Sequence, residues 1–116
     1  MVAQSFNLLV LKAINPKNLA KSWSTFGLEF VEESHDEGPV HYACNVGSIV
    51  LEIYPRETQE ASTQGVRFGI IVDDLRDIVS NLPNDMTLLE PVRSFDFGRR
   101  AVILDSEGHK IELSQS

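Results

Sequence analysis

The chain has 116 residues, of which 42% are hydrophobic and 23% are charged, and these values are typical of one ordinary globular domain. The formal charge of −7 argues against a nucleic-acid partner, which requires a basic face, and no apolar run reaches the roughly 20 residues that a membrane span needs. Cys44 is the single cysteine, so no internal disulfide is expected, and the absence of a signal-peptide pattern favours a cytoplasmic location.

The first half of the sequence predicts the element order β-α-β-β-β. Phe6–Ala13 is an apolar run of strand length. Asn15, followed by proline, suits the start of a helix, and Gly27 is expected to end that helix. Three further strands are predicted at Leu28–Glu33, Val40–Asn45 and Ile49–Tyr54.

The second half repeats this order after a polar linker at residues 55–64. Val66–Val72 is predicted to be a strand, and Asp74 suits the start of a second helix. The remaining strands are predicted at Met86–Phe95, Arg99–Leu104 and His109–Leu113. Pro91 interrupts the first of them, which is therefore expected at a sheet edge, where proline is tolerated. We therefore expect a single domain over residues 1–116, with one module at 5–54 and a second at 65–115.

A residue-by-residue comparison supports a duplication. Asn45–Ile53 aligns with Asp105–Leu113 at a constant offset of 60, and both segments end in an apolar-Glu-apolar triplet. Asn15 aligns with Asp74 at an offset of 59, each at a predicted helix start. A repeat of this kind predicts two equivalent modules.

Strand alternation predicts where the charged side chains of these strands point. Leu51 and Ile53 share a face that should pack on a helix, so Glu52 points to the opposite face. The same alternation turns Glu112 and Arg67 away from the helix of the second module. If the two non-helical faces curve toward each other, Glu52, Arg67 and Glu112 meet in one cavity.

The strings GVRFGIIVDDL and LDSEGHKIEL, together with the duplicated β-α-β-β-β order, resemble the glyoxalase, bleomycin-resistance and extradiol-dioxygenase superfamily, the vicinal oxygen chelate proteins. The resemblance covers about residues 5–115. It implies an α+β fold in which two βαβββ modules form an open, cupped barrel around a shared cleft. It also implies a homodimer, which open sheet edges would favour.

Metal-dependent members of that superfamily take ligands from the opening and closing strands of each module. Carried over to this sequence, the closing-strand positions are Glu52 and Glu112, and the opening-strand position of the second module is Arg67. The remaining position falls on Leu8, or on Asn7 for a register shifted by one. Leucine has no lone pair and arginine is always protonated, so no metal cofactor is expected. If a metal is present, its expected ligands are Glu52 and Glu112.

The function that this pattern favours is metal-independent binding of a small organic molecule, as in bleomycin-resistance-like proteins. A metal-dependent lyase or dioxygenase is the first alternative, and an interaction module with a vestigial cleft is the second. The sequence leaves open whether the protein is an enzyme. The residues expected to line the cleft are Leu8, Lys12, Glu52, Tyr54, Arg67, Phe97, Arg99 and Glu112.

The histidines and the cysteine give no catalytic pattern. His35 lies in an acidic turn and is expected to be solvated, and His109 is expected to be exposed or at the cleft rim. His41 and Cys44 fall on opposite faces of one strand, which argues against a Cys-His nucleophile. Cys44 is expected to be a small buried hydrophobic residue.

Overall fold

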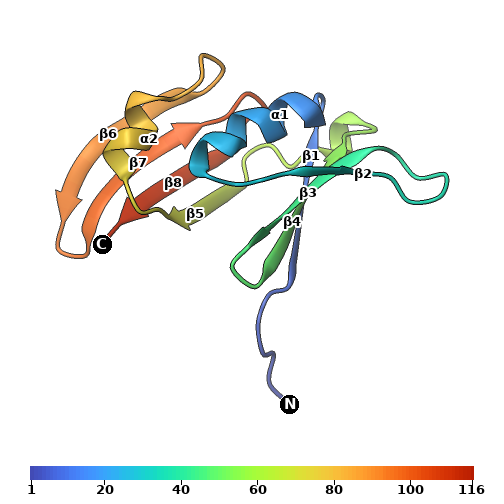
Figure 1. Cartoon of the computed structure of the whole chain (residues 1–116), viewed down its shortest axis with the longest axis horizontal. Coiled ribbons are helices and arrows are strands. Elements are labelled where there is room, and N and C mark those ends of the chain that lie inside the picture. Colours follow the sequence, from blue (N-terminus) through green and yellow to red (C-terminus); the bar gives the residue numbers. More distant parts are fainter. The chain divides into compact units, whose positions relative to one another are not determined.

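A computed structural model of the protein describes residues 1–116, except for the side chain of Glu60. The chain divides into two compact units, Met1–Ser62 and Thr63–Ser116. Each unit consists of one α-helix and one four-stranded sheet (Figure 1). None of the described helices has the length and apolar character that a membrane span requires.

The first unit has the predicted β-α-β-β-β order. In its sheet, which has the strand order β1-β4-β3-β2, β1 runs parallel to β4 and the other neighbours are antiparallel. The strand predicted to begin at Leu28 is shorter than expected, because pairing with β3 begins only at Val31. The elements are β1 (Leu8–Ala13), α1 (Pro16–Trp23), the 3-10 turn η1 (Ser24–Phe26), β2 (Val31–Glu33), β3 (His41–Val46), β4 (Ile49–Pro55) and the 3-10 turn η2 (Gln59–Ala61).

The second unit repeats this topology, with the strand order β5-β8-β7-β6 and β5 parallel to β8. As predicted from Pro91, β6 is an edge strand, and its pairing with β7 shifts register on both sides of Glu90. The elements are β5 (Arg67–Ile71), α2 (Leu75–Ser80), β6 (Thr87–Phe95), β7 (Gly98–Leu104) and β8 (Lys110–Gln115). The two-module α+β fold is therefore confirmed, and the two sheets are separate.

Both helices start at the residues that the repeat aligns. Asn15 Oδ1 accepts a hydrogen bond from the Asn18 amide at 3.0 Å, and Asp74 Oδ1 accepts one from the Asp77 amide at 3.1 Å. Each bond satisfies a backbone donor that has no partner within the helix. Gly27 follows η1 with a φ of 84°, a conformation that glycine adopts without steric cost.

One face of each sheet packs against its own helix, and the other face carries Glu52 in the first unit and Glu112 in the second. In the first unit α1 contacts β1, β3 and β4, and in the second α2 contacts β6, β7 and β8. The buried residues of the helix-facing layers are Leu11, Leu19, Trp23, Leu51 and Ile53 in the first unit, and Leu75, Ala101, Ile103, Ile111 and Leu113 in the second. The predicted alternation is confirmed, because Glu52 and Glu112 each lie between two of these buried apolar residues.

The β7–β8 turn corrects one expectation. His109 was expected to be exposed or at the cleft rim, but its side chain is fully buried. Asp105 explains the burial, because its Oδ2 accepts a hydrogen bond from His109 Nδ1 at 2.8 Å and its Oδ1 accepts from the amides of Glu107 and His109. The free ring nitrogen of His109 then accepts a hydrogen bond of 2.6 Å from the Thr63 hydroxyl. A fully bonded imidazole can be buried at little cost.

Candidate functional site

Strand register gives Glu52 and Glu112 equivalent places in the two units. Val10 of β1 pairs with Glu52, and Gly69 of β5 pairs with Glu112. Two residues earlier in each pair of strands, and so on the same face, Leu8 lies opposite Val50, and Arg67 lies opposite Lys110. Leu8 and Arg67 are therefore equivalent as well, as the superfamily resemblance implied.

Four charged side chains of the second unit form a connected network, here called the arginine–carboxylate cluster: Arg67, Glu90, Arg100 and Glu112. Glu112 Oε1 lies 2.7 Å from Arg100 Nη1 and 3.3 Å from Arg67 Nη2. The second terminal nitrogen of Arg100, Nη2, lies 3.4 Å from Glu90 Oε1. The side chains of Arg100 and Glu112 are each about 30% exposed or less, so water screens their attraction only in part.

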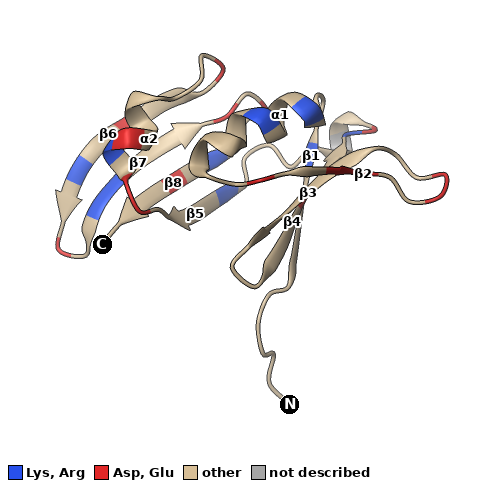
Figure 2. Ribbon diagram, viewed as in Figure 1, with Lys and Arg blue, Asp and Glu red and all other residues tan. Residues whose placement is uncertain are grey.

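Aromatic rings extend this cluster along the β6–β7 hairpin, where Figure 2 shows arginines in blue on both strands. The guanidinium carbons of Arg93 and Arg100 lie 5.5 and 5.0 Å from the centre of the Phe95 ring. Phe97 stacks on Phe95 with ring centres 5.2 Å apart. A cation over an aromatic face is attracted to it. Phe95 therefore helps Arg93 and Arg100 to lie opposite each other in the β6–β7 pair despite their like charges.

Arg99 was expected to line the cleft, and the strand register corrects this. Arg99 pairs with Gln115, whose side-chain oxygen accepts a hydrogen bond from the Leu75 amide at the start of α2. Arg99 therefore lies on the helix side of the sheet. Arg100, one residue later, lies on the side that carries Glu112. The sequence already indicated this, because Arg99 falls in the same alternating set as the apolar residues Ala101 and Ile103, which face the helix.

The first unit carries a different set of groups on its non-helical face. Lys12, Tyr54, His41 and Glu33 lie opposite one another in a row across β1, β4, β3 and β2. The Tyr54 ring stacks on the His41 ring with centres 4.1 Å apart, and Lys12 Nζ lies 5.2 Å from the centre of the Tyr54 ring. The register of His41 with Tyr54 follows from the antiparallel pairing of β3 with β4.

His41 is the buried centre of this row, with a relative exposure of 1%. Its Nε2 lies 3.2 Å from Glu33 Oε1, 3.7 Å from Glu52 Oε2 and 3.4 Å from the Tyr54 hydroxyl. Removal from water, and then the negative charges of Glu52 and Glu33, raise the pKa of the Tyr54 phenol. Tyr54 is therefore protonated at neutral pH and can donate its proton to His41.

Solved structures with the same architecture identify the fold. A bleomycin-binding protein from Streptomyces verticillus, complexed with copper(II)-bleomycin, is 20% identical with a TM-score of 0.66, over 100% of this chain and 99% of that one. An antibiotic-binding protein from a Streptomyces species is 16% identical with a TM-score of 0.73, over 99% and 98%. A glyoxalase-related enzyme from Fulvimarina pelagi is 16% identical with a TM-score of 0.73, over 98% and 89%.

This chain has the vicinal oxygen chelate fold. Neither a protein-family profile nor a curated protein sequence matches it. The structural likeness nevertheless extends over the whole chain and both units, as the sequence resemblance predicted.

The four positions to which the resemblance assigned metal ligands, Leu8, Glu52, Arg67 and Glu112, include only two side chains of a ligand type. Leu8 is 51% exposed and offers no lone pair. Arg67 contacts Glu112, as the sequence analysis predicted, and Lys12 contacts Tyr54. Phe97 is 57% exposed beside Phe95. The meeting of Glu52 with Arg67 and Glu112 stays a prediction.

The cleft residues expected from the sequence included Arg99 but not Arg100, and His41 was given too little weight. Burial of a histidine between two carboxylates becomes evident only when β2 and β3 are paired, because Glu33 and His41 are separated by a loop. Cys44, in contrast, is buried as predicted, with a relative exposure of 6%, on the face opposite His41. Burial raises the pKa of its thiol, which makes Cys44 a poor nucleophile.

Proposed function

We propose that this protein binds a small organic molecule on the non-helical faces of its sheets, without a metal at the four superfamily ligand positions. The observation that carries this proposal is the state of Glu112, whose Oε1 contacts two guanidinium groups at 2.7 and 3.3 Å. A carboxylate held by two permanent cations is a poor ligand for a third.

The chemistry of the cluster supports an anionic, aromatic ligand. Arg67, Arg93 and Arg100 supply more positive charge on this face than Glu90 and Glu112 neutralise. Guanidinium groups bind carboxylates and phosphates in a planar, two-point geometry, and exposed Phe97 offers a stacking surface beside them. The bleomycin-binding and antibiotic-binding neighbours support the binding of a small molecule by analogy of fold, and the anionic character is inferred from the arginines alone.

Replacing Arg100 by alanine is expected to weaken ligand binding about tenfold or more, because one ionic hydrogen bond contributes about 1.5 to 3 kcal/mol. A thermal-shift screen of EDTA-treated, full-length protein against aromatic acids and metal-free bleomycin would supply the ligand. Isothermal titration calorimetry of that ligand would then compare wild-type protein with the variant.

Arg99→Ala is the matched control, because it removes the same charge one residue away on the helix side of the sheet. Its affinity is expected to stay within about twofold of wild type. Equal losses in both variants would contradict a site at the cluster. Ligand binding that appears only after metal is added, and that is lost in Glu112→Gln, would support the metal-dependent alternative instead.

The proposal also includes a homodimer in the cytoplasm. Each sheet ends in two edge strands, and Ile71 on the edge strand β5 is 81% exposed. Edge strands and exposed apolar side chains favour association with a second chain. Sedimentation at micromolar concentration is expected to give twice the mass of the 13.0 kDa chain. A single species at the mass of one chain would contradict the dimer.

A further inference from the structure

The proposed ligand site does not use the most buried polar group of the first unit. His41 is 1% exposed, and its Nδ1 lies 3.2 Å from the carbonyl oxygen of Pro39. A carbonyl oxygen only accepts hydrogen bonds, so Nδ1 carries the proton and donates it. In the neutral imidazole, Nε2 then has the lone pair, which can accept a hydrogen bond or bind a cation.

That lone pair faces oxygen atoms that also carry lone pairs. Glu33 Oε1 lies 3.2 Å from His41 Nε2, and Glu52 Oε2 lies 3.7 Å from it. The Glu52 side chain is only 18% exposed, so little water separates these groups. Tyr54 supplies one donor at 3.4 Å, and Lys12 Nζ lies 5.2 Å from the centre of the Tyr54 ring. A proton or a metal cation between Nε2 and the carboxylates removes the repulsion.

A second imidazole favours the metal. His35 Nε2 lies 3.7 Å from Glu33 Oε1, and one ligand atom from each of Glu33, His35 and His41 lies within 4.8 Å of the other two. Tetrahedral zinc, with bonds of about 2.0 to 2.1 Å, holds its ligand atoms about 3.3 Å apart. Glu33 Oε1 lies 3.2 Å from His41 Nε2 and 3.7 Å from His35 Nε2, which is close to that value.

We propose that Glu33, His35 and His41 bind one divalent transition-metal ion of the zinc class. Two imidazoles and one carboxylate are ligands that zinc and its first-row neighbours prefer. The Pro39 carbonyl orients His41 by accepting its other ring proton, as carbonyl groups commonly do behind metal-bound histidines. Glu52 adds a second negative charge beside the ion.

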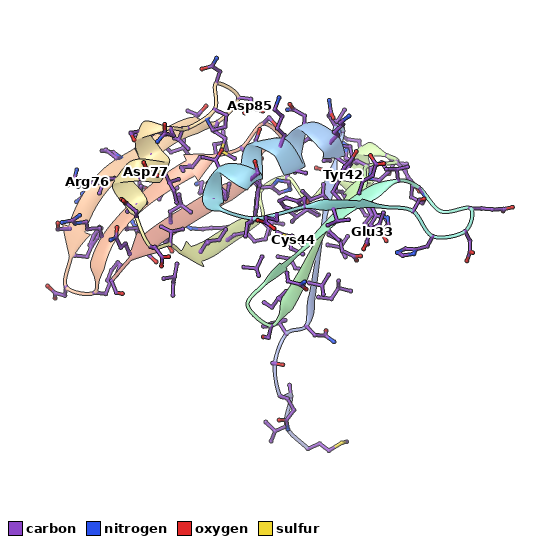
Figure 3. All side chains as sticks on the ribbon, in the orientation of Figure 1. Glu33, Tyr42, Cys44, Arg76, Asp77 and Asp85 are labelled. Carbon is purple, nitrogen blue, oxygen red and sulfur yellow. The ribbon has the colours of Figure 1, made fainter. Side chains whose placement is uncertain are left out.

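This site adjoins Glu52, but it takes none of its three ligands from the superfamily's metal positions. Its ligands come from β2, where Figure 3 labels Glu33, from the β2–β3 loop and from β3. None of them occupies an opening-strand or closing-strand ligand position. The inference is also independent of the proposed ligand site, because the three residues lie outside the arginine–carboxylate cluster.

The test is a titration of metal-free, full-length protein with Zn²⁺ by isothermal titration calorimetry, and with Co²⁺ by visible absorption. Wild-type protein is expected to bind one ion per chain. Glu33→Gln and His35→Ala are expected to weaken binding about tenfold or more. Both side chains reach solvent, at 37% and 69% exposure, so these variants are expected to fold.

Glu32→Gln is the matched control. It removes the same charge from the neighbouring residue of β2, where Glu32 points to the other face of the sheet and accepts a hydrogen bond of 2.9 Å from the Tyr42 hydroxyl. Its metal affinity is expected to equal that of wild type within about twofold. Retained binding in Arg100→Ala would show that the metal site does not depend on the proposed ligand site.

Three results would overturn the inference. The first is equal loss of affinity in Glu32→Gln and Glu33→Gln, which would indicate non-specific attraction of the cation. The second is loss of binding in Glu112→Gln with full binding in His35→Ala, which would move the metal to the superfamily position. The third is no Zn²⁺ binding together with NMR signals of a doubly protonated His41, which would identify the cation as a proton.

Discussion

Replacing Asp105 by alanine is expected to lower the free energy of unfolding by about 3 kcal/mol or more. The Asp105 side chain is fully buried and accepts three hydrogen bonds, from the Glu107 amide, the His109 amide and His109 Nδ1. Alanine would leave these donors buried without their acceptor. Urea denaturation followed by circular dichroism would measure the loss.

The repeat supplies the matched control for this variant. Asn45 is the residue that aligns with Asp105 in the first unit, and it is exposed. Asn45→Ala is therefore expected to change the free energy of unfolding by no more than about 0.5 kcal/mol. An Asp105→Ala protein as stable as Asn45→Ala would contradict a structural role for the Asp105–His109–Thr63 chain of hydrogen bonds.

The fold could be predicted because its determinants are local and occur twice. Asn15 and Asp74 cap the two helices, and apolar alternation assigns the two faces of each strand. The duplication then requires both halves to adopt one topology, which the strand orders β1-β4-β3-β2 and β5-β8-β7-β6 confirm. Helix capping, apolar alternation and the internal repeat all indicate the same architecture. The architecture could therefore be predicted more accurately than the ends of individual strands.

The candidate sites were less predictable, because they depend on which residues face each other across strands. The contact between Arg67 and Glu112 followed from alternation on two strands. The grouping of Glu33, His35 and His41 required the register of β2 with β3 and the path of a seven-residue loop, neither of which periodicity specifies.

The burial of His109 could not be read from alternation, because its environment is created by a turn. Gly108 and the charged neighbours of His109 suggested an exposed position. The Asp105 carboxylate changes this by bonding both the backbone and the ring of a residue four positions later. The spacing from Asp105 to His109 is a usable indication in retrospect, since aspartate often bonds the backbone of a turn that follows it.

A second large effect is expected at Gly98, the first residue of β7. Gly98→Ala is expected to lower the free energy of unfolding by about 3 kcal/mol. An added Cβ would overlap the carbonyl oxygen of Gln115 and lie 2.9 Å from the Cα of Ser116, and both atoms belong to backbone that cannot rotate away. The φ of 131° adds strain for any residue with a side chain. Urea denaturation would measure the loss of stability.

Two other glycines serve as controls that distinguish the effect of atomic overlap at Gly98 from the effect of its positive φ. Gly47 has a φ of 59° with nothing within 4 Å of an added Cβ, so Gly47→Ala is expected to cost only about 1 kcal/mol. Gly69 also has no neighbour within that distance and an ordinary φ, so Gly69→Ala is expected to change stability by no more than about 0.5 kcal/mol. A loss in Gly98→Ala no greater than that in Gly47→Ala would contradict close packing of the β6–β7 hairpin against the end of β8. The β6–β7 hairpin carries Phe95 and Arg100. Gly98→Ala is therefore also expected to weaken ligand binding at the arginine–carboxylate cluster, whereas Gly47→Ala should leave that binding unchanged.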